Sequence, residues 1–311
     1  MFIIVIMNYF HVKVMMKVSL VKYEILDKVA RLNSFTKAAE ILGLTQSAIS
    51  HAISSLEKDY GFALVHRNKH GVTLTDEGVI MLTAIRNVLH AEEMLKQEAA
   101  KIIGVTKGKV RIGTFSSIST KMMPKIIQLM DRQYPGIEIE LREGDYFEIE
   151  QWLKEGEIDC GFLNKTHTKQ TQFTPLLQDE LFCIVSSKST LFNKESVDLN
   201  EIETEPFILT TYNGPNDVLA IFERYRINPT IRFKLFDEKG VISMVEHNLG
   251  ITILPQLVID QLPKNVRKLK IKQESFRTIG LATKLQMSPA TEKFVEVLMH
   301  WLSTNEIVHK V

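Results

Sequence analysis

The chain has 311 residues, 45% of them hydrophobic and 24% charged, and its formal net charge at pH 7 is +1. This composition excludes a disordered chain, and the length suits two domains that each bury a core. A near-neutral total neither indicates nor excludes a nucleic-acid partner, because a local basic patch is compatible with it.

The first 16 residues, MFIIVIMNYFHVKVMM, form an apolar stretch interrupted by Asn8, His11 and Lys13. The stretch is too short and too interrupted to span a membrane, and it lacks the basic segment and cleavage site of a signal peptide. We expect residues 1–16 to be an N-terminal extension, either dispensable or preceding a native start near Met15 or Met16. Since no other apolar run has membrane-spanning length, we expect a cytoplasmic protein.

Residues 17–78 show the pattern of a small helical domain followed by a hairpin. The first helix is expected over 19–32. Ser34 is a typical N-cap for a second helix that ends at Gly43, and Thr45 caps a third helix that runs to about Tyr60. Three short helices with a glycine-containing turn match the helix-turn-helix motif. Two short apolar runs around 68–71 predict a β-hairpin, or wing.

The third helix carries short polar side chains on the face opposite its apolar stripe. Two rows with a spacing of four follow this face: Gln46, Ser50, Ser54 and Ser47, His51, Ser55. Short hydrogen-bonding groups let a helix approach base edges in the DNA major groove, whereas long acidic side chains would repel the phosphates. We interpret this face as a DNA-reading face; a neutral solvated face is the alternative.

A long helix is expected over 76–104, about 40 Å long at 1.5 Å per residue. Asp76 and Glu77 suit its first turn, and Gly104 ends it. Met81, Val88, Leu95 and Ile102 recur every seven residues, flanked by Ile85 and others. A stripe of this kind predicts pairing with a second helix, so we expect dimerisation through Met81, Ile85, Val88 and Leu95. Packing on its own domain is the alternative.

Strands and helices alternate from Lys109 onward. KVRIGTF, IEIELRE and DCGFLN are expected strands separated by helices, and a second such group runs from EPFILT to GITILP. This order predicts parallel sheet with right-handed crossovers. We expect 105–311 to form two α/β lobes: lobe I at about 105–164 and 267–311, and lobe II at about 165–266.

Residues 34–78 resemble the N-terminal domain of LysR-type transcriptional regulators. The resemblance rests on SFTKAAEILGLTQSAISHAISSLEKDYGFALVHR followed by LTDEG, with the family's spacing unchanged through Arg67. It implies an N-terminal all-α winged helix-turn-helix with a long linker helix and a C-terminal α/β two-lobed effector domain, similar to type 2 periplasmic binding proteins. The implied function is a DNA-binding transcription factor that responds to a small-molecule effector bound between the lobes.

The expected DNA-binding residues are Thr36, Thr45, Gln46, Ser47, Ser50, His51, Ser54, Arg67 and Lys69. By the resemblance, Gln46, Ser50 and His51 face the groove, and Arg67 and Lys69 of the wing contact the backbone. Two positions depart from the family pattern: His51 replaces the usual Arg, and Val65 replaces the usual Phe. Neutral His contacts DNA more weakly than Arg, and its charge depends on pH.

Two stretches are expected to hold the effector. TFSSIST (114–120) follows a strand and opens a helix, where hydroxyls, free N–H groups and the helix dipole favour an anion, most simply a carboxylate. LTTYNG (209–214) ends a strand of the other lobe. The expected contacts are Ser116, Ser117, Ser119, Thr120, Thr210 and Thr211, with Phe162 and Asn164 at the end of the third strand as weaker candidates. Ordinary capping and turn chemistry is the alternative.

Cys160 and Cys183 lie in apolar, strand-like runs, so we expect buried reduced thiols; a redox-sensing pair would need exposure. No nucleophile–base set, G-x-G-x-x-G or P-loop is present, and His66 and His70 lack further metal ligands. We therefore expect no catalytic residue, cofactor or metal. The expected partners are double-stranded promoter DNA, a small-molecule effector, a second copy as homodimer or homotetramer, and RNA polymerase. A solute-binding protein and an enzyme are the rival interpretations.

Overall fold

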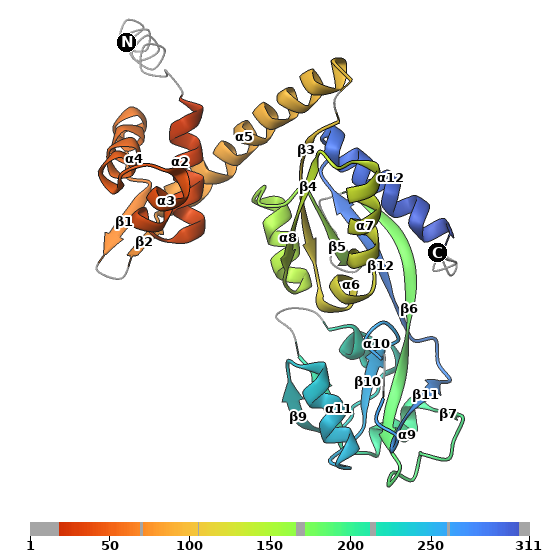
Figure 1. The fold of residues 1–311 in the computed structure, drawn as a ribbon. Helices are drawn as coiled ribbons and strands as arrows, with labels where there is room; N and C mark the ends of the chain where they lie inside the picture. Colours follow the sequence, from red (N-terminus) through yellow and green to blue (C-terminus); the bar gives the residue numbers. More distant parts are fainter. Residues whose placement is uncertain are drawn as a thin grey trace, which may run out of the picture. The chain divides into compact units, whose positions relative to one another are not determined.

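The computed structural model describes residues 19–68, 71–104, 106–165, 172–211, 216–259 and 262–304. The chain divides into two compact units, residues 1–99 with 154–157 and residues 100–153 with 158–311. Figure 1 labels their elements. Within the described residues, no helix is long and apolar enough to cross a membrane.

The N-terminal unit begins with three short helices, α2 (Leu20–Leu32), α3 (Phe35–Leu42) and α4 (Gln46–Tyr60). Their ends follow the expected signals. The hydroxyl of Ser34 accepts from the backbone N–H of Lys37 and that of Thr45 from Ala48, while Gly43 takes the left-handed conformation with φ 64°. The three helices pack around a common core centred on Leu26, Val29, Ala38, Ile49 and Ile53.

The wing consists of β1 (Val65–Asn68) and β2 (Gly71–Leu74), paired antiparallel. Glu57 on α4 fixes its first strand, because the carboxylate accepts from the N–H groups of Leu64 and Val65 at 2.9 and 3.2 Å. Gly78 must lack a side chain, since a Cβ there would lie 2.1 Å from the carbonyl oxygen of Leu64. Thr75 caps the next helix through the N–H of Gly78. The L-T-x-x-G pattern therefore joins the wing closely to that helix.

The following helix, α5 (Asp76–Ile102), is as long as expected. The residues of the predicted dimerisation stripe differ in exposure: two pack on the core of the N-terminal unit, and two face solvent. Ile85 is 1% exposed and belongs to the core of the N-terminal unit, and Met81 packs against the same core. The assignment of Ile85 was wrong, because the first turns of α5 complete their own domain, whereas that of the partly buried Met81 stays a prediction. Val88 and Leu95 are 42% and 70% exposed, so they remain available to a second helix.

The first lobe of the C-terminal unit contains a sheet in the order β4-β3-β5-β12-β6. Its strands are β3 (Gly108–Thr114), β4 (Ile137–Glu143), β5 (Cys160–Asn164) and β12 (Phe276–Thr283), with the first part of β6 (Gln172–Ser186). Its helices are α6 (Ser116–Lys121), α7 (Met123–Gln133), α8 (Tyr146–Lys154) and α12 (Pro289–Thr304). β3 pairs parallel with β4 and β5, as expected, but β12 is antiparallel to both of its neighbours, so the sheet is mixed.

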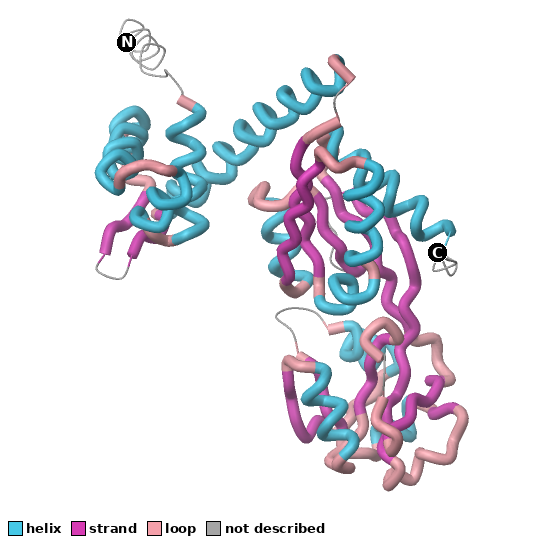
Figure 2. The backbone as a smooth tube through the Cα atoms, viewed as in Figure 1, coloured by secondary structure: helices cyan, strands magenta, loops and turns pink. Residues whose placement is uncertain are grey.

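The second lobe is built on the remainder of β6, which pairs with β10 (Thr252–Pro255) and β11 (Val266–Ile271). A parallel pair, β8 (Phe207–Thr210) and β9 (Ile231–Leu235), lies beside it. The other elements of this lobe are β7 (Ser196–Val197), α9 (Leu199–Glu203), α10 (Asp217–Tyr225) and α11 (Glu238–Glu246). Figure 2 shows β6 as one long strand that runs through both lobes.

The pairing of β6 corrects the lobe boundaries expected from the sequence. Residues 172–180 pair with β12 and belong to the first lobe, although the sequence boundary put them in the second. Residues 267–270 pair with the second half of β6 and belong to the second lobe, although the sequence boundary put them in the first. The chain changes lobe within β6 and again between β11 and β12.

The two cysteines lie in separate cores. Cys160 is fully buried in the first lobe and Cys183 is fully buried in the second. Burial raises the pKa of both thiols well above the ordinary value. The expected buried thiols are confirmed, and this location does not suit a redox-sensing pair.

Candidate DNA-reading face and effector cavity

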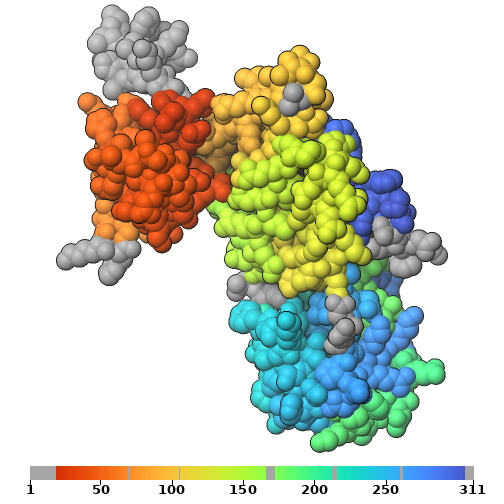
Figure 3. Space-filling model, in the orientation of Figure 1, coloured from red at the N-terminus to blue at the C-terminus, as the bar shows by residue number. Residues whose placement is uncertain are grey.

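The polar face of α4 lies on the surface of the N-terminal unit. Gln46, Ser47, His51 and Ser54 are exposed, and Ser50 is half-buried. The opposite face buries Ile49, Ile53 and Leu56 in the core. Figure 3 shows the surface of the N-terminal unit in red and orange. The helix therefore presents donors and acceptors outward on a rigid support, as direct contact with base edges requires.

Arg67 of the wing lies against α4. Its guanidinium donates to the hydroxyls of Ser50 and Ser54 at 2.9 and 2.8 Å and sits over the ring of Phe35 at 5.2 Å. The carboxylate of Glu57 is 3.8 Å away. This arrangement places one positive charge beside the polar face of α4.

The other expected DNA contacts have mixed outcomes. Thr36 is exposed on α3, and Thr45 is exposed although its hydroxyl caps α4. Lys69 lies outside the described residues. Ser55, which shares a row with Ser47 and His51, accepts a hydrogen bond from Lys22 of α2 at 2.7 Å. That residue therefore braces the helix rather than facing outward.

In the C-terminal unit, a cavity of about 470 Å³ is lined by both lobes. Phe115, Tyr146 and Arg277 come from the first lobe, and Phe236 and Val258 come from the second. The size suits a small organic molecule, and the lining combines apolar rings with a few polar groups, as is typical of ligand sites.

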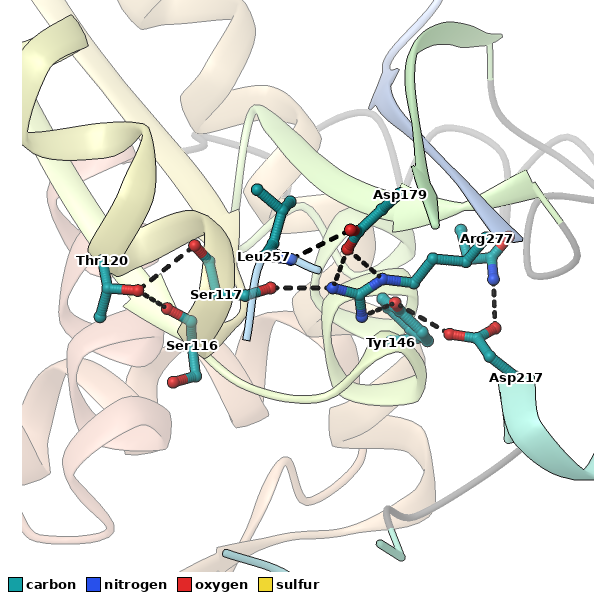
Figure 4. A network of polar contacts seen from close by, with 9 residues as sticks. Ser116, Ser117, Thr120, Tyr146, Asp179, Asp217, Leu257 and Arg277 are labelled. Atoms are coloured by element: carbon teal, nitrogen blue, oxygen red, sulfur yellow. Dashed lines mark hydrogen bonds and ion pairs between the residues drawn. The ribbon is translucent and has the colours of Figure 1, made fainter. Parts of the chain in front are cut away.

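Arg277 on β12 is the centre of a polar network at this cavity (Figure 4). Its Nε and Nη2 donate to one carboxylate oxygen of Asp179 at 3.0 and 2.8 Å. Nη2 also donates to Ser117 Oγ at 3.0 Å, and Nη1 donates to Tyr146 Oη at 3.0 Å. Tyr146 in turn donates to Asp217 at 3.4 Å, so the network joins the first lobe to the start of α10 in the second. Asn164 donates to the same carboxylate.

The charges of this network are set by burial and pairing. Burial lowers the pKa of the Arg277 guanidinium, but Tyr146, Asp179 and Asp217 together raise it above the ordinary value, so the group stays charged. Burial raises the pKa of Asp179, against the lowering effect of Arg277. Burial also raises the pKa of Tyr146, which therefore keeps its proton as a donor.

Only part of the expected effector set lines the cavity. Ser116 and Ser117 do, but Ser119 and Thr120 bond within their own segment: Ser119 Oγ to Thr114 Oγ1 at 3.4 Å and Thr120 Oγ1 to the Ser116 carbonyl at 2.9 Å. Phe162 is fully buried in the core of the first lobe, and its assignment to the effector was wrong.

The second expected stretch also lies apart from the described lining. Thr211 is tied to β9, with its N–H and hydroxyl both bonded to the carbonyl of Leu235. Thr210 is buried at the end of β8, and neither threonine is among the described residues that line the cavity. Residues 212–214 of the same stretch lie outside the described residues.

Several lining residues were missed by the sequence analysis. Asp145 and Asp237 cap α8 and α11, and Asp217 stands in the first turn of α10. A helix start that directly follows a strand was the signal used for residues 114–120, and it also occurs at EGDY and FDEKG. Arg277 offered a weaker signal, an isolated charge at the start of an otherwise apolar strand.

The charges that line the cavity argue against the expected anion. Among the described lining residues, Arg277 is the cation and five residues carry carboxylates. They are Glu143, Asp145, Asp217, Asp237 and Glu238. The Arg277 guanidinium already bonds to Asp179, so an anionic ligand would have to compete with a buried ion pair.

Two family models match the chain. The model described as "LysR substrate binding domain" matches residues 104–303, and "Bacterial regulatory helix-turn-helix protein, lysR family" matches residues 20–79. The first match covers most of the second unit, and the second match lies within the first unit.

Curated relatives are similar over most of the chain. The uncharacterized HTH-type transcriptional regulator YvbU of Bacillus subtilis strain 168 is 30% identical over 284 residues, which cover 90% of this chain and 97% of the relative. The HTH-type transcriptional activator CmpR of Synechocystis is 28% identical and covers 77% of this chain and 80% of the relative.

Solved structures with the same fold include two full-length regulators. A full-length OxyR variant of Pseudomonas aeruginosa has a TM-score of 0.76 at 19% identity and covers 93% of this chain and 96% of that one. Full-length CbnR in complex with its target DNA has a TM-score of 0.64 at 18% identity and covers 91% of this chain and 99% of that one. At these identities the likeness concerns the fold alone.

Proposed function

The chain belongs to the LysR family of bacterial transcriptional regulators, and from this premise we propose how it recognises its promoter and its effector. It is a DNA-binding regulator with a helix-turn-helix domain and a substrate-binding domain. The family and its relatives are transcriptional regulators, which favours this function over the rival enzyme and solute-binding interpretations.

The exposed face of α4 is the observation that carries the proposed DNA contact. Gln46 and His51 contact base edges, and Thr36, Thr45 and Ser47 contact the adjacent backbone. Arg67, held on α4 by Ser50 and Ser54, neutralises a phosphate next to the reading helix. Lys69 is expected to add a second backbone contact from the wing.

The cavity between the lobes is the proposed effector site. Since both lobes line it, a bound molecule stabilises one arrangement of the lobes over others, and this differential affinity is what an effector needs to change the DNA-bound state. Ser116 and Ser117 remain in this proposed site, joined by Tyr146, Asp217 and Arg277. The anion expected from the serine-rich helix start has no support in the charges of the lining.

Oligomer formation completes the proposal. The exposed Val88 and Leu95 on α5 form part of a helix pair between two copies, and a tetramer would require a further surface. The regulator acts in the cytoplasm, where its promoter DNA is found. RNA polymerase stays a predicted partner.

Binding to promoter DNA can be measured by fluorescence anisotropy with the DNA upstream of the chain's own coding region and a scrambled duplex of equal length. We expect specific binding. The affinity should fall steeply between about 50 and 200 mM salt, because added salt opposes the release of counterions from the DNA. Gln46→Ala should lose about 1–3 kcal/mol on the upstream DNA and little on the scrambled duplex. Equal affinity of the wild type for both duplexes would contradict the choice of promoter. An unchanged Gln46→Ala variant would contradict the role of α4.

A further inference from the structure

We propose that the effector is an organic cation with an apolar body, such as a primary amine, rather than an anion. This inference rests on the proposed function of the cavity as the effector site. It is carried by three observations on the same cavity: the saturation of its guanidinium, the acidic starts of its helices, and the aromatic groups in its wall.

Arg277 has little capacity left for an anionic ligand. A guanidinium has five N–H donors, and four of them are used on Asp179, Ser117 and Tyr146. At most one donor is left for a ligand. Its charge is also matched by the buried carboxylate of Asp179, at 2.8 Å. An anion would gain only by breaking that pair, which leaves a buried carboxylate without its cation.

The helix starts around the cavity carry their own carboxylates. Asp145 accepts from the N–H of Glu148 in α8, and Asp237 accepts from the N–H of Gly240 in α11, both at 2.9 Å. Asp217 and Glu238 stand in the first turns of α10 and α11. The N–H groups that attract anions to a helix start are therefore partly occupied by the protein itself.

The balance of charge stays negative after the helix dipoles are counted. The described lining holds five carboxylates against one guanidinium, and that guanidinium is already paired with Asp179. Each of the four helix starts, α6, α8, α10 and α11, contributes about half a positive charge, or about two in total. A lining with this predominance of carboxylates favours a cation over an anion.

The apolar part of the wall favours an organic cation over a hydrated metal ion. Phe115, Phe236 and Val258 line the cavity, and Phe236 is 68% exposed. An exposed aromatic face attracts ammonium groups and packs against a carbon skeleton. In the portion of the chain that is described, no three carboxylate, thiol or imidazole groups converge as metal ligands would.

Matched probes test the sign of the charge on one skeleton. The melting temperature and the Kd of the full-length protein are measured with 2-phenylethylamine, 2-phenylethanol and 3-phenylpropionate, with butane-1,4-diamine, butane-1,4-diol and succinate, and with Mg²⁺. The amines should raise the melting temperature, and the alcohols and carboxylates of the same skeletons should not. No shift with either amine, or a larger shift with a carboxylate, an alcohol or Mg²⁺, would overturn the proposal.

Two variants locate the cation. Glu238→Gln and Asp237→Asn keep the size of the side chain, and Asn still caps α11. Each should raise the amine Kd about tenfold, because a charge-assisted hydrogen bond is lost. The control is Glu292→Gln, the same change in the first turn of α12 outside the cavity, and it should bind the amines as the wild type does. Amine binding that is unaffected by both cavity variants would overturn the assignment. Promoter binding of the wild type without probe, measured on the same preparation, tests the proposed function separately.

Discussion

Arg277 on β12 and Asp179 on β6 occupy the same register position of two antiparallel strands, and their side chains form a buried ion pair. The pair lies next to the point where β6 passes from one lobe to the other. The Leu257 N–H, from the segment after β10, donates to the same aspartate at 3.0 Å, so this aspartate connects both lobes. Losing the cation would leave a charge that nothing else in the network neutralises.

The first prediction is that Arg277→Met destabilises the C-terminal unit by about 3–5 kcal/mol, because Asp179 is left buried without its partner. Urea unfolding followed by tryptophan fluorescence measures this effect, since Trp152 and Trp301 both lie in the core of the first lobe. The double variant Arg277→Met/Asp179→Leu should recover much of the loss. Arg267→Met, an exposed change on β11, is the control. A cost below about 1 kcal/mol for the single variant would mean that the pair is solvated.

The second prediction concerns the contact between wing and reading helix. Ser50→Ala and Arg67→Ala should each weaken promoter binding, but the double variant should lose less than the sum of the two. The reason is that Ser50 Oγ accepts from the guanidinium and holds it beside the helix. The double-mutant cycle, measured by anisotropy at one fixed salt concentration, gives the coupling energy, which we expect to be about 0.5–1.5 kcal/mol. Strict additivity would show that the two residues contact DNA independently.

The third prediction is that Val88→Asp yields a smaller particle in light scattering. A carboxylate in a helix pair would be desolvated without a partner, whereas Val88 is 42% exposed in the single chain and tolerates a polar side chain there. Asn87→Asp introduces the same group one position earlier, at an already polar residue, and should leave the mass unchanged. Equal masses for Val88→Asp and the wild type would show that α5 does not form the pair.

The fourth prediction is a loss of stability at alkaline pH. The pKa of Cys160 and of Cys183 is raised in the folded state, so the unfolded thiols ionise first as the pH rises. The stabilising contribution is therefore complete below the unfolded pKa of about 8.5 and declines above it, by about 1.4 kcal/mol per pH unit and thiol. Between about pH 8 and 10, the Cys160→Ala/Cys183→Ala variant should lose less stability in urea than the wild type. Identical slopes would show that the thiols ionise equally in both states.

The N-terminal domain was predictable because its signals are local. Ser34, Gly43 and Thr45 mark helix ends through contacts within four residues, and the structure places them as expected. The same sequence did not show that Met81 and Ile85 belong to the domain core. A heptad spacing of apolar residues is the same whether the helix packs on the core of its own domain or on a second helix. Only the packing in the structure distinguishes these two cases.

The effector cavity was less predictable because its residues are assembled by strand pairing. Arg277 and Asp179 are 98 positions apart and meet only through the register of β6 and β12. Only the second half of the long strand β6, the apolar run around Cys183, was recognised as strand-like, since polar residues interrupt the pattern where β6 changes neighbours. A rule that treated every strand end equally would have found Asp145, Asp217 and Asp237 alongside Ser116 and Ser117.

The continuity of β6 has a consequence for protein engineering. Because one unbroken strand supplies hydrogen bonds to both lobes, cleaving the backbone at either lobe boundary expected from the sequence would separate paired strands instead of freeing an intact module. A chimaera that takes its second lobe from a relative must keep β6 whole and join the chains after Ser186 and between β11 and β12. Such a graft would exchange the carboxylates of α10 and α11 while retaining Arg277 and Asp179. It should therefore change the ligand preference of the cavity without disturbing the ion pair between these two residues.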